Sequence, residues 1–152
     1  MTKLVFLGGT AANNKWRDGF IERLVAQGVK KEQLFDPVVA DWNDAAVKRE
    51  EEAKRNASYH LYYLADPQQE GNPLSAYSMV EAAIGLAKRP KTTVIVFDTT
   101  GISGHAAKAM KQTGARFREE YPKANIFSTP KDAEDWLVAQ LTRSFFGRLL
   151  AA

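Results

Sequence analysis

Five short runs of apolar and β-branched residues alternate with five segments of helical character, and this alternation limits the possible folds more than any other feature of the sequence. Strands are expected at residues 4–7, 33–39, 58–65, 92–97 and 125–128. Helices are expected at residues 15–27, 44–56, within 72–87, at 105–120 and at 130–149. Parallel strands joined by helical crossovers produce such an alternation. Residues 1–152 are therefore predicted to form one α/β domain, a flavodoxin-like or Rossmann-like three-layer sandwich around a five-stranded parallel sheet of order 2-1-3-4-5.

The composition excludes several classes of metal and cofactor site. A chain of 152 residues, 45% of them apolar, suits a single core. Without cysteine it can form neither a disulfide framework nor a thiolate metal site. With only two histidines, a His-rich metal site is not expected. His60 lies within an expected strand and is interpreted as structural, and His105 is expected to be a surface or capping residue. No metal and no cofactor are therefore expected.

Charge and hydropathy also argue against membranes and nucleic acid as partners. No apolar run approaches the ~20 residues that span a bilayer, and no basic region precedes an apolar one at the N-terminus. The net charge is only +3, and lysines and arginines are scattered among acidic residues rather than clustered on one segment. A soluble, cytoplasmic protein is expected, without a membrane or a nucleic-acid polymer as partner.

Polar and glycine-containing segments follow the expected strands, at the edge of the sheet where open parallel sheets bind ligands. These segments are residues 8–16, Asp36, residues 66–81 and residues 98–105. The turn Gly8-Gly9-Thr10 would let backbone N–H groups approach a ligand. A site is therefore predicted where six residues converge, which are Gly8, Gly9, Thr10, Asp66, Ser75 and Glu81.

Glu81 is the residue around which this site is expected to form. Pro73 and Ser75 are helix start signals, so Glu81 falls no later than the second helical turn. The apolar residues at three- and four-residue spacing, expected to be buried, are Met79, Val80, Ala83, Ile84 and Ala87. The helix dipole should keep the carboxylate ionised, and an ionised, partly buried carboxylate can attack an electrophilic carbon. The alternative, an ordinary surface glutamate, is the commoner case.

The residues at the strand ends exclude several common chemistries. A phosphoacceptor receiver needs an acidic pair where Gly8-Gly9-Thr10 stands, and a Walker loop needs Lys-Ser or Lys-Thr where Lys15-Trp16 stands. Three spaced glycines of a dinucleotide fingerprint are missing, and Gly101–Gly104 lacks the Gly-x-Ser-x-Gly spacing of a serine hydrolase. The remaining pair, Asp66 and Glu81, suits cleavage of a glycosidic bond. One carboxylate would attack or stabilise the anomeric carbon, and the other would handle a proton on the leaving group.

Three segments resemble one family. Residues 4–10 (Leu-Val-Phe-Leu-Gly-Gly-Thr), residues 35–39 (Phe-Asp-Pro-Val-Val), and Asp66 followed by Ser75 and Glu81 are similar to the nucleoside 2-deoxyribosyltransferase family and its relatives, the 2'-deoxynucleoside 5'-monophosphate N-glycosidases. The resemblance covers about residues 3–98, and the last third matches only in layout. After Glu81 the sequence is Ala-Ala-Ile-Gly, which departs from the Glu-x-Gly-x-Ala pattern common in the family.

This resemblance implies specific roles for the site residues. Glu81 would be the nucleophile that forms a covalent deoxyribosyl intermediate, and Asp66 would handle the proton at the base. Ser75 matches the position that contacts phosphate in the monophosphate hydrolases, and Gly8–Thr10 would line the sugar or base pocket. The resemblance also implies a homo-oligomer in which partner residues complete the pocket. The apolar tail around residues 145–150 would supply an interface or be buried within the monomer.

Three further residues are candidates for substrate binding, each with a structural alternative. Trp16 would stack on a base or belong to the core, and Arg17 would pair with a phosphate or be a solvated helix charge. Tyr77 would line the pocket or be buried in the core. The expected partner is thus a small-molecule nucleoside or nucleotide, and the expected activity is N-glycosidic cleavage or transfer. A catalytically silent nucleotide-binding or sensor module, and an NAD or nucleotide glycohydrolase, remain the alternatives.

Overall fold

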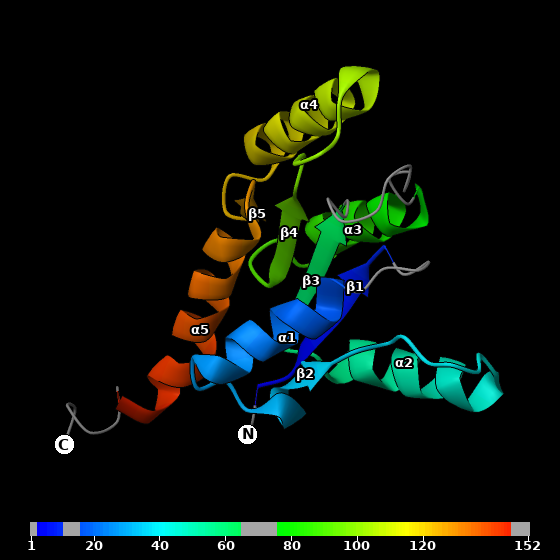
Figure 1. Ribbon diagram of the computed structural model, residues 1–152, viewed down its shortest axis with the longest axis vertical. Coiled ribbons are helices and arrows are strands. Elements are labelled where there is room, and N and C mark those ends of the chain that lie inside the picture. The colour runs from blue at the N-terminus through cyan, green and yellow to red at the C-terminus, as the bar shows by residue number, and fades with distance from the viewer. Residues whose placement is uncertain (1–2, 11–15, 65–75, 147–152) are drawn as a thin grey trace.

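The computed structural model describes residues 3–10, 16–64 and 76–146, with side chains as far as residue 142. The strands are β1 (Val5–Gly9), β2 (Leu34–Phe35), β3 (Tyr59–Leu64), β4 (Thr93–Phe97) and β5 (Asn125–Phe127). The helices are α1 (Trp16–Ala26), α2 (Asp44–Asn56), α3 (Ala76–Lys88), α4 (Gly104–Glu120) and α5 (Pro130–Phe146), with a 3₁₀ turn at Lys31–Gln33. Every strand pair is parallel and the order is β2-β1-β3-β4-β5 (Figure 1), so the predicted fold class and strand order are confirmed.

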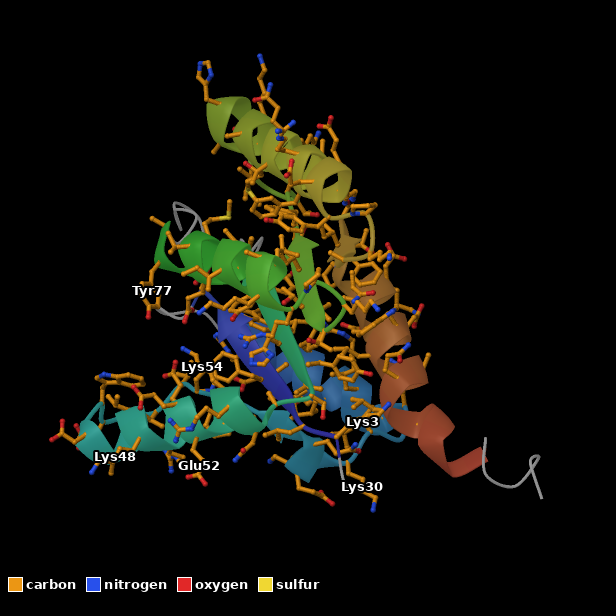
Figure 2. All side chains as sticks on the ribbon, turned by 180° about the vertical axis from the view of Figure 1, so that it is seen from behind. Lys3, Lys30, Lys48, Glu52, Lys54 and Tyr77 are labelled. Carbon is orange, nitrogen blue, oxygen red and sulfur yellow. The ribbon has the colours of Figure 1, made fainter. Side chains whose placement is uncertain are left out.

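Helices cover both faces of the sheet because successive strand residues point to opposite faces. One core cluster joins α1 and α5 to strand residues such as Leu7, Leu61 and Val96. A second cluster joins α3 and α4 to Tyr62, Ile95 and other residues of the opposite face. Helix α2 lies on the same face as α3, as the view from behind shows (Figure 2). Among the described helices, none combines the length and the apolar character that crossing a membrane requires.

Local capping signals account for two of the helix starts. The side chain of Asn43 accepts hydrogen bonds from the N–H groups of Ala45 and Ala46, which caps α2 as the sequence predicts. At the start of α5, Thr129 accepts a hydrogen bond from the Asp132 N–H at 3.2 Å and donates one to the Asp132 carboxylate at 2.6 Å. Ser103, a residue type that can cap a helix, stands at the N-cap of α4 but makes no side-chain capping bond there.

The second strand is shorter than the sequence predicts. Only Leu34–Phe35 pairs with β1, although residues 33–39 were expected to be extended. Pro37 has no N–H to donate to the sheet. The Asp36 carboxylate accepts a hydrogen bond from the Val38 N–H at 2.9 Å, and this local turn directs the chain away from the sheet. The strand is at the edge of the sheet, as Pro37 indicated.

Helix α3 buries a different face from the one predicted. Val80 and Ile84 are 56% and 48% exposed, and Ala87 is also exposed, whereas Met79 and Ala83 are half-buried. The buried residues of α3 are Ser78, Ala82, Gly85 and Leu86. A Cβ at Gly85 would lie 3.1 Å from the Thr93 hydroxyl and 3.3 Å from the Tyr62 ring, so the small residues set how closely α3 packs on the sheet. Helix α3 is therefore rotated about its axis relative to the prediction, and the larger side chains of Val80 and Ile84 face solvent.

Two other burial predictions can be compared with the structure. The spacing of apolar residues in the first helix predicts that Phe20, Leu24 and Val25 face inward. Phe20 and Leu24 are buried, but Val25 is 41% exposed. The same spacing in the last helix predicts burial of Ala133, Leu137 and Leu141, which are buried, and of Trp136, which is half-buried. Residue 145 and residues 147–150 of the apolar tail lie beyond the described side chains.

Candidate functional site

Glu81 lies in the second turn of α3 and is tied to α2 by an ion pair. Its Oε1 accepts a hydrogen bond from Lys54 Nζ at 2.7 Å, and the same ammonium lies 2.6 Å from Glu50 Oε1. The Glu81 side chain is 19% exposed, so it is partly buried against α2 and does not lie in bulk solvent. Figure 2 shows Lys54 on the side of α2 that faces α3. Glu81 is therefore a partly buried carboxylate with a fixed counter-ion.

The sequence of α2 explains why Lys54 reaches this position. Glu50 and Lys54 are four residues apart and so share one helix face. Lys54 Nζ also lies 5.0 Å from the centroid of the Phe6 ring, within the range of a cation–π contact. The Lys54 carbonyl accepts a hydrogen bond from His60 Nε2 at 2.8 Å. The ammonium group of Lys54 is thereby held near β1, and its backbone carbonyl is held against β3.

The charges around Glu81 determine the protonation of its neighbours. Burial lowers the pKa of Lys54, but hydrogen bonds to Glu50 and Glu81 outweigh it and raise the pKa above its ordinary value. Lys54 is therefore a cation at neutral pH. The pKa of Tyr62 is raised, first by burial and then by the charge of Glu81, although a hydrogen bond with Arg89 opposes the shift. Tyr62 therefore keeps its phenolic proton.

The glycine turn is packed closely against β3. A Cβ at Gly8 would lie 2.8 Å from the Tyr62 ring, on the sheet face that α3 covers. Gly9 has φ +118°, and a Cβ there would lie 2.2 Å from the Tyr63 carbonyl oxygen. Thr10 is buried, and its hydroxyl oxygen has no hydrogen-bond partner among the residues that the structure describes. The turn therefore needs glycine for packing. It ends at the Thr10 hydroxyl, a buried polar group without a described hydrogen-bond partner.

Trp16 and Arg17 support this turn from the other side of the sheet. The Arg17 guanidinium is buried and donates to three backbone carbonyls: Leu7 at 2.9 Å, Thr10 at 2.9 Å and Gly9 at 3.2 Å. The Trp16 indole donates to the Thr10 carbonyl at 3.1 Å, and its ring stacks on Tyr63 at 4.5 Å between centroids. Trp16 thus has the core position that the sequence left open, and Arg17 is not a solvated helix charge. Contacts of either residue with a base or phosphate remain predictions.

A row of alternating charges connects the turn to Glu81. Arg17 lies 3.5 Å from the Asp36 carboxylate, and burial lowers the pKa of Arg17 to about 10 although the charges of Asp36 and Glu50 oppose the shift. Glu50 acts on Arg17 at long range and pairs directly with Lys54, which pairs with Glu81. From the end of β2 to α3 the charges therefore alternate in sign, in the order Asp36, Arg17, Glu50, Lys54 and Glu81.

The other predicted site residues are distributed as follows. Tyr77 is 72% exposed and projects from the start of α3 (Figure 2), so its alternative of burial in the core was wrong. Asp66 and Ser75 lie outside the described residues, and their convergence with Glu81 stays a prediction. His60 is buried in β3, as a structural histidine would be, and His105 is exposed on α4.

Sequence reasoning missed Lys54 and Glu50, although their four-residue spacing was a usable signal. Asp98 begins the segment 98–105 that the sequence places at the edge of the sheet. It is buried and accepts a hydrogen bond from the Tyr63 hydroxyl at 2.7 Å and one from the Thr100 N–H at 2.9 Å. Within the described ranges, no group of three His, Cys, Asp or Glu side chains is arranged to hold a metal ion.

Comparisons of the chain with protein-family models, with curated proteins and with solved structures gave no match.

Proposed function

We propose that the chain cleaves or transfers the N-glycosidic bond of a (deoxy)nucleoside or its 5'-monophosphate, with Glu81 as the nucleophile. The observation that carries this proposal is the Glu81 carboxylate itself: it is 19% exposed, and one oxygen is fixed by Lys54. Its other oxygen, Oε2, accepts no hydrogen bond from a described residue. The similarity of residues 4–10 and 35–39, with Asp66, Ser75 and Glu81, to the nucleoside 2-deoxyribosyltransferase family supplies the substrate class.

The proposed reaction has two steps, as in retaining glycosidases. In the first, Glu81 forms an ester bond to C1' while the C1'–N bond breaks and its electron pair leaves with the base, which takes a proton from Asp66. In the second, water attacks C1', releases the Glu81 carboxylate and returns a proton to Asp66. A second base in place of water would give transfer. Gly8–Thr10, Trp16, Arg17, Ser75 and Tyr77 are the proposed substrate-binding residues, and no metal or other cofactor takes part.

A panel of deoxynucleosides, ribonucleosides, their 5'-monophosphates and NAD tests this function. Each compound is incubated with the protein, with and without a second free base, and products are separated by chromatography. We expect release or exchange of the base from at least one compound, and its loss in Glu81→Gln. Glu52→Gln is the matched control, because Glu52 is an exposed glutamate on the outer side of α2 (Figure 2). An active Glu81→Gln variant would refute the assignment of the nucleophile.

The second candidate is a catalytically silent nucleotide-binding or sensor module. One observation favours it: the Lys54–Glu81 ion pair joins α2 to α3 and gives Glu81 a structural use without chemistry. The same panel separates the two functions. Binding of a nucleotide without release of base by the wild-type protein supports the silent module, whereas release from NAD alone would indicate a glycohydrolase.

Self-association belongs to the same proposal. The exposed apolar residues Tyr77, Val80 and Ile84 lie at three- and four-residue spacing on the outer side of α3, next to the turn that carries Glu81. We expect light scattering to show an oligomer, and the double variant Val80→Glu, Ile84→Glu to reduce its mass. A monomeric wild-type protein at micromolar concentration would contradict this part of the proposal.

A further inference from the structure

Lys54 is held by three neighbours that come from three different elements. A lysine ammonium has three N–H donors. Two of them are used by Glu50 of α2 and Glu81 of α3, and the charge also lies over the Phe6 ring of β1. The Lys54 side chain is only 25% exposed. The ammonium is therefore a fixed charge and not a mobile surface lysine.

The contact with Lys54 makes the two oxygens of Glu81 different from each other. Oε1 is occupied by the ammonium at 2.7 Å, which reduces its ability to attack, whereas Oε2 accepts no hydrogen bond from a described residue. A single contact thus distinguishes the two oxygens and leaves Oε2 as the one available for attack on carbon.

Glu50 would keep Lys54 paired with a carboxylate during the covalent step. When Glu81 becomes an ester it loses its negative charge, and a partly buried ammonium without a partner is costly. Glu50 lies 2.6 Å from Lys54 Nζ, so the ammonium would keep one carboxylate throughout the reaction. A structural bridge between two helices needs only one carboxylate on the lysine. The need for a counter-ion while Glu81 is an ester explains why Lys54 has two.

Building on the proposed function, we propose that Lys54 is a positioning residue that orients Glu81 with Oε2 toward the sugar, and that Glu50 is its permanent counter-ion. Lys54 does not touch the substrate in this scheme, so it acts on the rate of the chemical step and not on substrate binding. The titratable groups that face Lys54 are Glu50 from its own helix, Glu81 from α3, and His60 and Tyr62 from β3.

The test compares Lys54→Met and Lys54→Arg with Lys48→Met, using the compound that the wild-type protein cleaves fastest. Lys48 is an exposed lysine of α2 that points away from α3 (Figure 2), so it controls for loss of one positive charge from the same helix. We expect Lys54→Met to lower kcat about 100-fold, as for loss of one preorganised donor, and to change KM by less than about threefold. Lys54→Arg should recover part of kcat, and Lys48→Met should behave as wild type.

The outcomes separate this inference from the proposed function. If the wild-type protein is active and a folded Lys54→Met matches Lys48→Met in kcat, the inference is overturned and the function stands. If the wild-type protein releases no base from any compound, both are overturned. If Lys54→Met does not fold, Glu50→Gln decides: a reduced kcat with KM changed by less than about threefold supports the inference, and a wild-type kcat overturns it.

Discussion

Acidification should destabilise the fold through His60, and the size of the effect follows from its surroundings. His60 is 2% exposed, and its Nε2–H donates to the Lys54 carbonyl at 2.8 Å. Its Nδ1 has no hydrogen-bond partner among the described residues. Burial lowers the pKa of His60 from 6.5 to about 4, and the charges of Arg89 and Lys54 act in the same direction while the hydrogen bond to the Lys54 carbonyl opposes them.

The sign and magnitude follow from proton linkage. Between the unfolded pKa of 6.5 and the folded pKa of about 4, the unfolded chain binds more protons at His60 than the folded chain does. The free energy of unfolding therefore falls as the pH falls from about 6.5 to about 4, and this contribution levels off below that range. The full loss is about 3 kcal/mol, of which about 2.5 kcal/mol is reached near pH 4.5.

Urea unfolding at about pH 7.5 and about pH 4.5 measures this loss when His60→Gln is compared with the wild-type protein. A glutamine can still donate to the Lys54 carbonyl but does not titrate. Carboxylates contribute almost equally to both proteins, so the wild-type protein should lose about 2.5 kcal/mol more than the variant. His105→Gln, at the exposed histidine, should behave as wild type. Equal losses in wild type and His60→Gln would refute the reasoning.

Two matched pairs of variants test the packing of the glycine turn by urea unfolding. Gly9→Ala should cost about 3 kcal/mol or more, because φ is +118° and the new Cβ would lie 2.2 Å from the Tyr63 carbonyl oxygen. Gly28→Ala, with φ +91° and nothing within 4 Å of the Cβ, should cost only about 1 kcal/mol; equal costs would contradict the clash. Arg17→Met should cost about 3 to 5 kcal/mol, since three backbone carbonyls lose a buried donor. Arg49→Met, at an exposed position, should stay within about 0.5 kcal/mol of wild type, and a similar value for Arg17→Met would contradict the buried role.

The architecture was predictable because it depends on patterns that local sequence carries. The bounds of α2 match the expected residues 44–56, because Asn43 is a strong capping residue and the charged run favours helix. The strand order follows from five alternations of strand and helix, which leave few arrangements of a parallel sheet.

The face that α3 buries was not predictable from apolar spacing. Hydrophobic periodicity gives most weight to large side chains, so it selected Val80 and Ile84. The helix instead packs through Ala82 and Gly85, because the Tyr62 and Thr93 side chains fill the space above the sheet and leave room only for small residues. Such a preference depends on the opposing strand and therefore cannot be read from the helix alone.

The candidate site was only partly predictable from the sequence, because most of its contacts join residues from different elements. Glu81 was singled out from its place after a helix start, and the structure describes it as a partly buried carboxylate. Lys54 and Glu50 were missed because their helix carries many charges, and only the contact across to α3 distinguishes this pair. Arg17 was missed as a buried residue because its partners are backbone carbonyls, which no side-chain pattern reveals.

The central claim is that Glu81 becomes covalently attached to C1' of a sugar. A nucleoside with fluorine at C2' and a base that is a good leaving group tests it most directly. The fluorine slows both formation and hydrolysis of the glycosyl ester, whereas the good leaving group speeds only formation, so the intermediate accumulates. Intact-protein and peptide mass spectrometry should show one added sugar, on the peptide that contains Glu81, with none in Glu81→Gln. Turnover of substrate without any adduct, or an adduct on a different residue, would contradict the account.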